Sequence, residues 1–265
     1  MNNNVKNAWK PGTFKPDFNT TKPKIMNRIF LAGIFFILAL TSCRFVTGER
    51  VNGNGVIKSE TRSVGTFSSI DVSGNIDVYV KQDSVVSVRI EADENLLGYV
   101  HINADGGTLE IQEEKGFNLE SAKGIKVYVS GPSFKRFEAS GACDIYSENK
   151  ISSSNEISMS ATGASSIIME LNAPKLEAEF TGASHVTLKG ETKIFSADGS
   201  GASGIKCFEL MTEETDVEVS GASHAEVFAS VKLDAHASGA SSVQYKGNAT
   251  VTQETNGASS VKKVE

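Results

Sequence analysis

A four-residue pattern, Ser/Thr/Asn-Gly-Ala-Ser/Cys, recurs seven times in the C-terminal half of the chain. Its central glycines follow one another at intervals of 18 to 22 residues, at Gly141, Gly163, Gly182, Gly201, Gly221, Gly239 and Gly257. A period near 20 residues is typical of stacked repeat architectures. Because each unit is too short to bury a core of its own, neighbouring units must share one. The repeat therefore predicts a solenoid.

Each repeat alternates apolar and polar residues on both sides of its glycine. In Lys175–Gly190, the apolar residues Leu176, Ala178 and Phe180 alternate with polar residues up to Gly182, and the alternation resumes after it. A period of two residues indicates strands with one buried face. Glycine at the bend between two such strands permits a positive φ or a close approach of neighbouring coils. We predict an all-β solenoid with coils of about 20 residues.

A second column of identical residues stands two places after each glycine. It consists of Cys143, Ser165, Ser184, Ser203, Ser223, Ser241 and Ser259. By strand parity these side chains face inward, where hydroxyls can bond to the backbone of the turn. A nucleophilic serine needs a paired base and an oxyanion hole. His185 and His224 directly follow a serine, so they point to the opposite face. We predict that the glycine and serine columns are structural, with no catalytic residue and no cofactor.

The N-terminus reads as a targeting segment. Ile29–Leu40 is an apolar run of 12 residues that follows Arg28. This length suits a signal peptide better than a membrane-spanning helix. Leu40-Thr41-Ser42-Cys43 resembles a bacterial lipobox, which implies lipidation of Cys43 as the mature N-terminus. The alternatives are an ordinary secreted protein or a short membrane anchor with a chance cysteine. Residues 1–25 are either a longer basic lead or lie upstream of the true start at Met26.

The charge of the mature chain excludes one class of partner. The full chain has 26 Lys/Arg and 32 Asp/Glu, and residues 1–42 hold six of the former and one of the latter. The remainder has 20 basic and 31 acidic residues, a net charge of −11. Nucleic-acid binding relies on basic patches, so we expect no nucleic-acid partner. Membrane attachment then depends on the lipid alone.

Two further features of the sequence are possible sites. Cys143 and Cys207 lie three repeats apart, about 14 Å along a stack, which is too far for a disulfide. We therefore predict two free, buried thiols. Three places before each glycine stand Glu138, Ser160, Glu179, Asp198, Glu218, His236 and Glu254. We interpret this acidic column as solvated surface without a metal; the alternative is a weak stripe of sites for divalent cations.

Several short segments point to a known family. They are SGNIDVYV at Ser73, ADENLL at Ala92, GTLEI at Gly107 and IKVYV at Ile125, together with the repeat. From about Val64 to Val261 the chain resembles the auto-transporter adhesin, head GIN domain family, which is common in Bacteroidota. The resemblance implies a right-handed, parallel β-helix-like solenoid in a secreted or lipoprotein setting. The aspartate that commonly follows the motif in that family stands here only at Asp144.

These observations divide the chain into four parts. They are an N-terminal extension with a lipoprotein signal peptide (1–42), a linker (43–63), an irregular N-terminal β cap (64–132) and a repeat solenoid (133–265). The combination predicts a non-enzymatic lipoprotein of the cell envelope, anchored in the membrane through Cys43, whose head serves in adhesion or binds a protein partner or a glycan. The alternatives are an envelope scaffold or sensing module and, less favoured, a polysaccharide-active enzyme, which would need carboxylates clustered in a cleft. The oligomeric state and the membrane face stay open.

Overall fold

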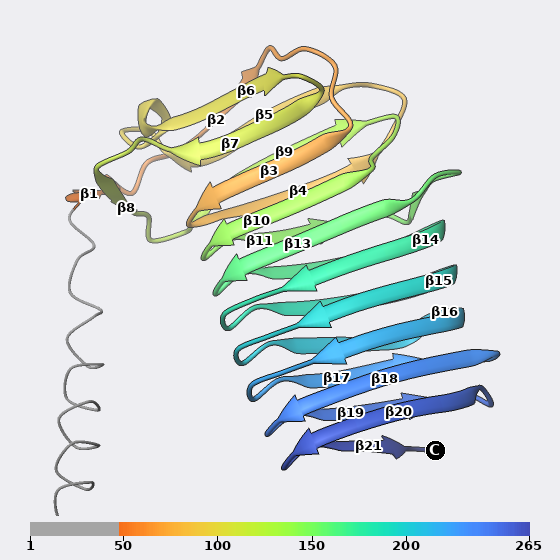
Figure 1. Ribbon diagram of the computed structural model, residues 1–265. Coiled ribbons are helices and arrows are strands. Elements are labelled where there is room, and N and C mark those ends of the chain that lie inside the picture. Colours follow the sequence, from red (N-terminus) through yellow and green to blue (C-terminus); the bar gives the residue numbers. More distant parts are fainter. Residues whose placement is uncertain (1–47) are drawn as a thin grey trace, which may run out of the picture. The chain divides into compact units, whose positions relative to one another are not determined.

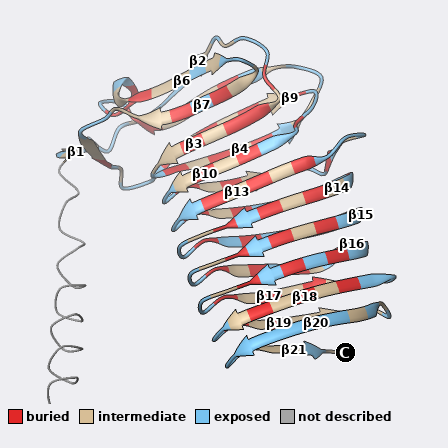
Figure 2. Cartoon of the chain, in the orientation of Figure 1, coloured by how far each residue is buried: buried red, intermediate tan, exposed pale blue. Residues whose placement is uncertain are grey.

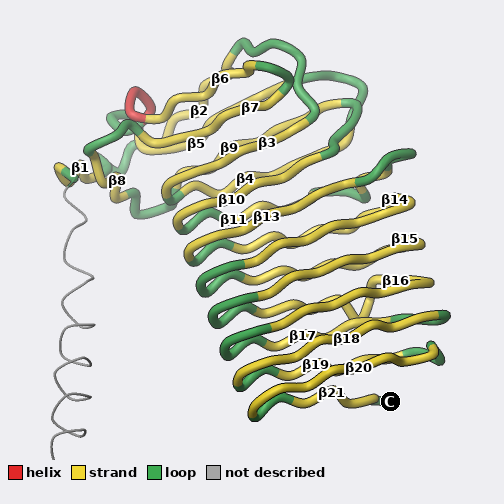
Figure 3. Tube along the Cα trace, viewed as in Figure 1, coloured by secondary structure: helices red, strands yellow, loops and turns green. Residues whose placement is uncertain are grey.

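The computed structural model describes residues 48–265, which form a stack of parallel strands. Figure 1 shows the rungs of this stack, and Figure 3 shows strands joined by short turns. Among the described residues the only helical element is the short 3₁₀ turn η2 (Leu97–Tyr99). None of their helices is long and apolar enough to cross a membrane. The signal segment and Cys43 lie outside the described residues.

Each coil contributes one strand to each of two layers. Layer A precedes the glycines and consists of β3 (Ser69–Gly74), β10 (Arg136–Gly141), β13 (Ile157–Gly163), the C-terminal halves of β14 (Ser166–Phe180), β15 (His185–Gly199) and β16 (Gly204–Val219), then β18 (Lys232–Gly239) and β20 (Thr250–Gly257). Layer B follows the glycines and consists of β4 (Ile76–Gln82), β11 (Asp144–Ser147), the N-terminal halves of β14, β15 and β16, then β17 (His224–Phe228), β19 (Ser242–Lys246) and β21 (Ser260–Lys263). The pairing is parallel and keeps the glycines opposite one another. The predicted all-β solenoid is confirmed.

The N-terminal rungs do not follow chain order. The rung of β3 and β4 pairs on one side with β10 and β11, and on the other with β7 (Thr108–Glu113) and β9 (Ile125–Gly131). Residues 69–82 therefore lie between a rung made by residues 108–131 and one made by residues 136–147. Gly74 lies opposite Gly141 and is an eighth member of the glycine column.

Antiparallel strands close the N-terminal end of the stack. β5 (Ser87–Asp93) pairs with β9, β2 (Ile57–Arg62) pairs with β5, and β6 (Val100–Asp105) pairs with β7. β1 (Glu49–Asn52) forms a separate parallel pair with β8 (Phe117–Glu120), and β12 (Ile151–Ser152) adds a short pair to β14. The sequence predicts a linker over residues 43–63, yet β1 and β2 lie within it. Their side chains are mostly exposed, so the apolar alternation that reveals the other strands is weak there.

The core is a set of apolar columns between the two layers. Figure 2 shows buried positions alternating with less buried ones along most strands. The largest fully buried side chains include Phe134, Phe137, Phe180 and Phe195. In the last rung the inward positions carry the polar Gln253 and Thr255, and β20 is largely exposed. Polar terminal units of this kind keep the end of a solenoid soluble.

Both cysteines of the described residues are free and buried, which confirms the expectation. Burial raises the pKa of the Cys143 thiol to about 12, and it does the same for Cys207. The thiolate is the reactive form, so both thiols are poor nucleophiles near neutral pH.

Candidate functional site

The repeat glycines form a corner that excludes any side chain. From Gly74 to Gly257 the eight glycines of the column have φ between +75° and +115°. A Cβ on Gly163 would lie 2.5 Å from the carbonyl oxygen of Gly141, and the other successive members meet in the same way. The following residue uses that carbonyl: the amide of Ala164 donates to it at 2.7 Å. The column therefore sets the spacing between rungs.

The serine column lies inside this corner. Ser165, Ser184, Ser203, Ser223 and Ser241 are buried, and Ser259 in the last rung is partly exposed. The hydroxyl of Ser203 donates to the carbonyl oxygen of Ser200 at 2.6 Å, and Ser184, Ser223, Ser241 and Ser259 repeat this bond three residues back. Among the described residues, every hydrogen bond of this column joins a serine to a backbone group. The arrangement braces the turn.

Substitution of Ser203 tests this role. Ser203→Cys should be tolerated, because Cys143 already occupies the equivalent place in its coil. It should lose about 1 kcal/mol of stability, since the hydrogen bond of the hydroxyl is lost. Ser203→Leu should lose a further 1–3 kcal/mol or so, since extra methyl groups overpack a filled corner. Thermal melting followed by circular dichroism measures the difference. Equal melting temperatures for the two variants would mean that the column does not face inward.

The acidic column stands on the outer face of layer A. Glu138 is paired with Arg136, and His236 lies 3.6 Å from Glu254. Glu179, Asp198 and Glu218 in the middle rungs make no ion pair with any described residue. Partial burial, together with the charge of Glu218 and further carboxylates, raises the pKa of Asp198. Within residues 48–265 no group of three or more ligating side chains is arranged to hold a metal ion.

Four shallow hollows follow one another across this face. Their volumes are about 360, 400, 240 and 190 Å³ in order along the stack. Neighbouring hollows share lining residues: Arg136 and Ser158 join the first pair, Glu179 and Asp198 the second, and Glu218 the third. The four hollows therefore lie next to one another in a row, which we call the trough. It runs over β7 and layer A from Thr108 to Asn256.

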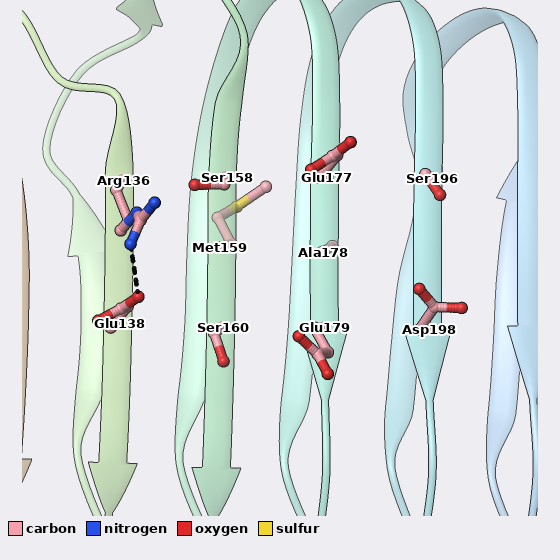
Figure 4. Close-up of a pocket in the computed structure, with 10 residues that line it drawn as sticks. All are labelled: Arg136, Glu138, Ser158, Met159, Ser160, Glu177, Ala178, Glu179, Ser196 and Asp198. Carbon is pink, nitrogen blue, oxygen red and sulfur yellow. Dashed lines mark hydrogen bonds and ion pairs between the residues drawn. The ribbon is translucent and has the colours of Figure 1, made fainter.

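Hydroxyls and carboxylates recur along the trough. Figure 4 shows its second hollow, where Ser158, Ser160 and Ser196 alternate with carboxylates on neighbouring strands. The column next to the glycines adds a hydroxyl at most rungs, including Thr181 and Ser200. Apart from the buried Phe180 and the imidazole of His236, no aromatic ring lines any of the four hollows. The surface offers many short hydrogen-bonding groups and no deep pocket.

Layer B carries a different feature on its outer face, a stack of three tyrosines. The ring centroids of Tyr128 and Tyr79 are 5.1 Å apart, and those of Tyr79 and Tyr146 are 5.2 Å apart. The guanidinium of Arg89 covers the free face of Tyr128 at 3.9 Å, and the hydroxyl of Tyr146 donates to Asp144 at 3.0 Å. Burial raises the pKa of Tyr79 and of Tyr146. Both faces of Tyr79 and of Tyr128 are therefore covered, so these two rings present mainly their edges and hydroxyls.

The tyrosine stack was not among the features predicted from the sequence. The sequence carries one sign of it: Tyr79 and Tyr146 each stand five residues after a glycine of the column, so they occupy equivalent positions in their coils. The histidines are also separated in the structure. The ring of His185 lies over Gly204, where a Cβ would be 2.7 Å from its Cδ2, whereas His224 hydrogen-bonds Ser242 through Nδ1 at 2.8 Å.

Comparison with known proteins agrees with this architecture. The model of the family described as "Putative auto-transporter adhesin, head GIN domain" matches residues 66–249. The chain belongs to the head GIN domain family. The match lies within the stretch that the sequence motifs indicate, so the resemblance is confirmed. A comparison with curated proteins finds no match.

Several solved structures share the head GIN fold. One, described as a putative adhesin from Bacteroides fragilis, has a TM-score of 0.76 at 19% identity and covers 81% of this chain and 100% of that chain. A putative lipid binding protein from Parabacteroides distasonis has a TM-score of 0.70 at 20% identity and covers 82% and 100%. A putative adhesin from Parabacteroides merdae has a TM-score of 0.65 at 21% identity, with the same coverage. At these identities the likeness shows the fold alone.

Proposed function

We propose that this head GIN protein is a non-enzymatic lipoprotein of the cell envelope, anchored through Cys43, whose trough binds an extended glycan in adhesion. The trough is the observation that carries the proposal. Small molecules bind in enclosed, mostly apolar pockets, whereas the trough is long and shallow. It is lined mostly by hydroxyls and carboxylates, with Lys135 and Arg136 in the first hollow and His236 in the last. Such groups hydrogen-bond the hydroxyls of a sugar chain, and repetition along the stack multiplies weak contacts. The description of related structures as adhesins supports the same function.

The arrangement of the carboxylates favours binding over cleavage. Glycoside hydrolysis uses two carboxyl groups that flank the scissile bond. Glu179, Asp198 and Glu218 instead stand in a single column on one surface, in register along adjacent strands. A sugar chain lying on this column would meet all three from the same side.

Blocking the trough tests the proposal. The full-length protein in vesicles is incubated with a panel of immobilised polysaccharides, and bound protein is measured. The double variant Ser160→Trp, Ser196→Trp should reduce binding at least tenfold, because two large rings then fill the second hollow. Replacing Glu179, Asp198 or Glu218 singly by Gln should change binding less than threefold, since the contacts are spread over many rungs.

Thr187→Trp on the exposed face of layer B is the matched control and should bind like the parent. Circular dichroism verifies that all variants keep the parent fold. Equal binding by the blocked variant and the parent, or no binding to any polysaccharide, contradicts the glycan proposal. Release of shortened sugar products would replace it with an enzymatic function.

A further inference from the structure

The first turn of the head is tied to its N-terminal end by a dense set of hydrogen bonds. We call residues Asn52–Val56, with Asp93–Asn95, Glu120 and Ser121, the latch. Its bonds run from Gly53 N to Glu120 O (2.8 Å), Asn54 N to Asn95 Oδ1 (2.9 Å), Asn95 Nδ2 to Asn52 O (2.8 Å), Gly55 N to Asp93 Oδ1 (2.6 Å) and Glu94 N to Val56 O (2.8 Å). One turn is thus held by two other segments of the chain.

A buried carboxylate lies at the centre of the latch. Asp93 is 1% exposed, and besides Gly55 it accepts a 2.6 Å hydrogen bond from the hydroxyl of Ser121. Hydrogen bonds to an ionised group are stronger than those between neutral groups. A Cβ on Gly53 would lie 2.3 Å from Cγ of Asp93, so the turn packs directly on the carboxylate. The carboxylate of Asp93 is therefore enclosed by the turn and by Ser121.

The strands on either side of the turn are also paired. β1 pairs with β8 along its whole length, and the amide of Glu49 donates to Gly116 O at 2.7 Å. β2 pairs with β5 from Ile57 to Arg62. The chain from Glu49 to Arg62 is therefore bonded almost continuously to the head. No slack tether remains between residue 48 and the stack.

We propose that the latch keeps this end of the stack against the lipid bilayer, so that the rung of β20 and β21 points away from it. The inference rests on the proposed lipidation of Cys43. Four residues separate Cys43 from Gly48, and five residue steps span at most about 18 Å. Release of residues 48–56 would extend this reach to about 50 Å. β1 and the C-terminal rung lie at opposite ends of the stack (Figure 1).

The display geometry follows from this short connection. The glycine column from Gly74 to Gly257 has seven intervals, about 34 Å at 4.8 Å each. The trough runs along the same direction, so its C-terminal hollows lie farthest from the lipid surface. The latch thus determines which rungs an extended partner reaches first.

Energy transfer to labelled lipid tests the orientation. Lys115→Cys places a donor fluorophore beside β1, and Lys262→Cys places one in the last rung; both sites are exposed. Cys143 and Cys207 are buried, so they stay unlabelled under native conditions. In phosphatidylcholine vesicles with an acceptor lipid, transfer from residue 115 should exceed transfer from residue 262 at least threefold. Equal or reversed transfer would overturn the orientation.

Breaking the latch tests its role. Asn95→Ala removes two of its bonds and should lower transfer from residue 115 at least twofold, with faster proteolysis between residues 48 and 56. A ten-residue Gly/Ser insertion after Thr47 should lower transfer to the same degree without touching the fold. Asn103→Ala, at an exposed position of β6, is the matched control and should change nothing. Unchanged transfer in both the Asn95 variant and the insertion variant would show that the latch does not hold the head at the membrane.

The two proposals fail in different ways. Labelling with a palmitate analogue is measured on the same samples. Absence of label would refute the anchor itself, and with it the inference that depends on it. Labelled protein with equal transfer from residues 115 and 262 would refute only the orientation.

Discussion

Replacing Gly201 with alanine should destabilise the stack strongly. Its φ is +83°, and an added Cβ would lie 2.5 Å from the carbonyl oxygen of Gly182. A non-glycine residue held in this conformation costs about 1–3 kcal/mol, and the contact with backbone adds to that, because neither strand can shift without breaking its ladder. Thermal melting followed by circular dichroism should show a lower melting temperature, and Gly201→Val should lower it further.

Gly204, three residues after Gly201, provides a matched control. Its φ is not positive, and the nearest atoms to its added Cβ all belong to the His185 ring, with Cδ2 closest at 2.7 Å. That ring lies at the end of an exposed side chain and can turn away. Gly204→Ala should therefore melt close to the parent. If the variants of Gly201 and Gly204 melted alike, the glycine column would not be what spaces the rungs.

Replacing Cys43 with serine should abolish lipidation. A thioether-linked lipid needs the cysteine sulfur, which a serine hydroxyl does not supply. Metabolic labelling with a palmitate analogue should be lost completely, and an unlipidated precursor should accumulate. This is an all-or-none effect, because Cys43 is the single proposed site of the lipid.

Cys143→Ser is the control for that experiment. The equivalent position of the other coils is serine, so the fold should tolerate the change, and labelling should stay at the level of the parent. Labelling that persists in Cys43→Ser, or that disappears in Cys143→Ser, would place the lipid elsewhere and contradict the lipobox interpretation.

The site was only partly visible in the sequence. The acidic column could be read directly, because each of its members stands at the same distance from a glycine of the repeat. The acidic column lines the trough together with serines of neighbouring strands. Which serines lie beside which carboxylates depends on the register between those strands, across all four hollows. The tyrosine stack is not apparent from the sequence, because one of its members, Tyr128, lies in a strand without the repeat motif. It stacks on Tyr79, 49 residues earlier in the chain.

The sequence by itself determined the rung. Period, alternation, bend glycine, inward serine and two free thiols are all local features, and each coil repeats them within about 20 residues. Only the tertiary structure decided the order of the first rungs and the pairing of residues 49–62 with β8 and β5. β3 lies between β7 and β10, and the turn at Gly53 packs on Asp93, 40 residues away. Such contacts depend on pairing between distant segments that share no repeat period, so no local sequence pattern predicts them.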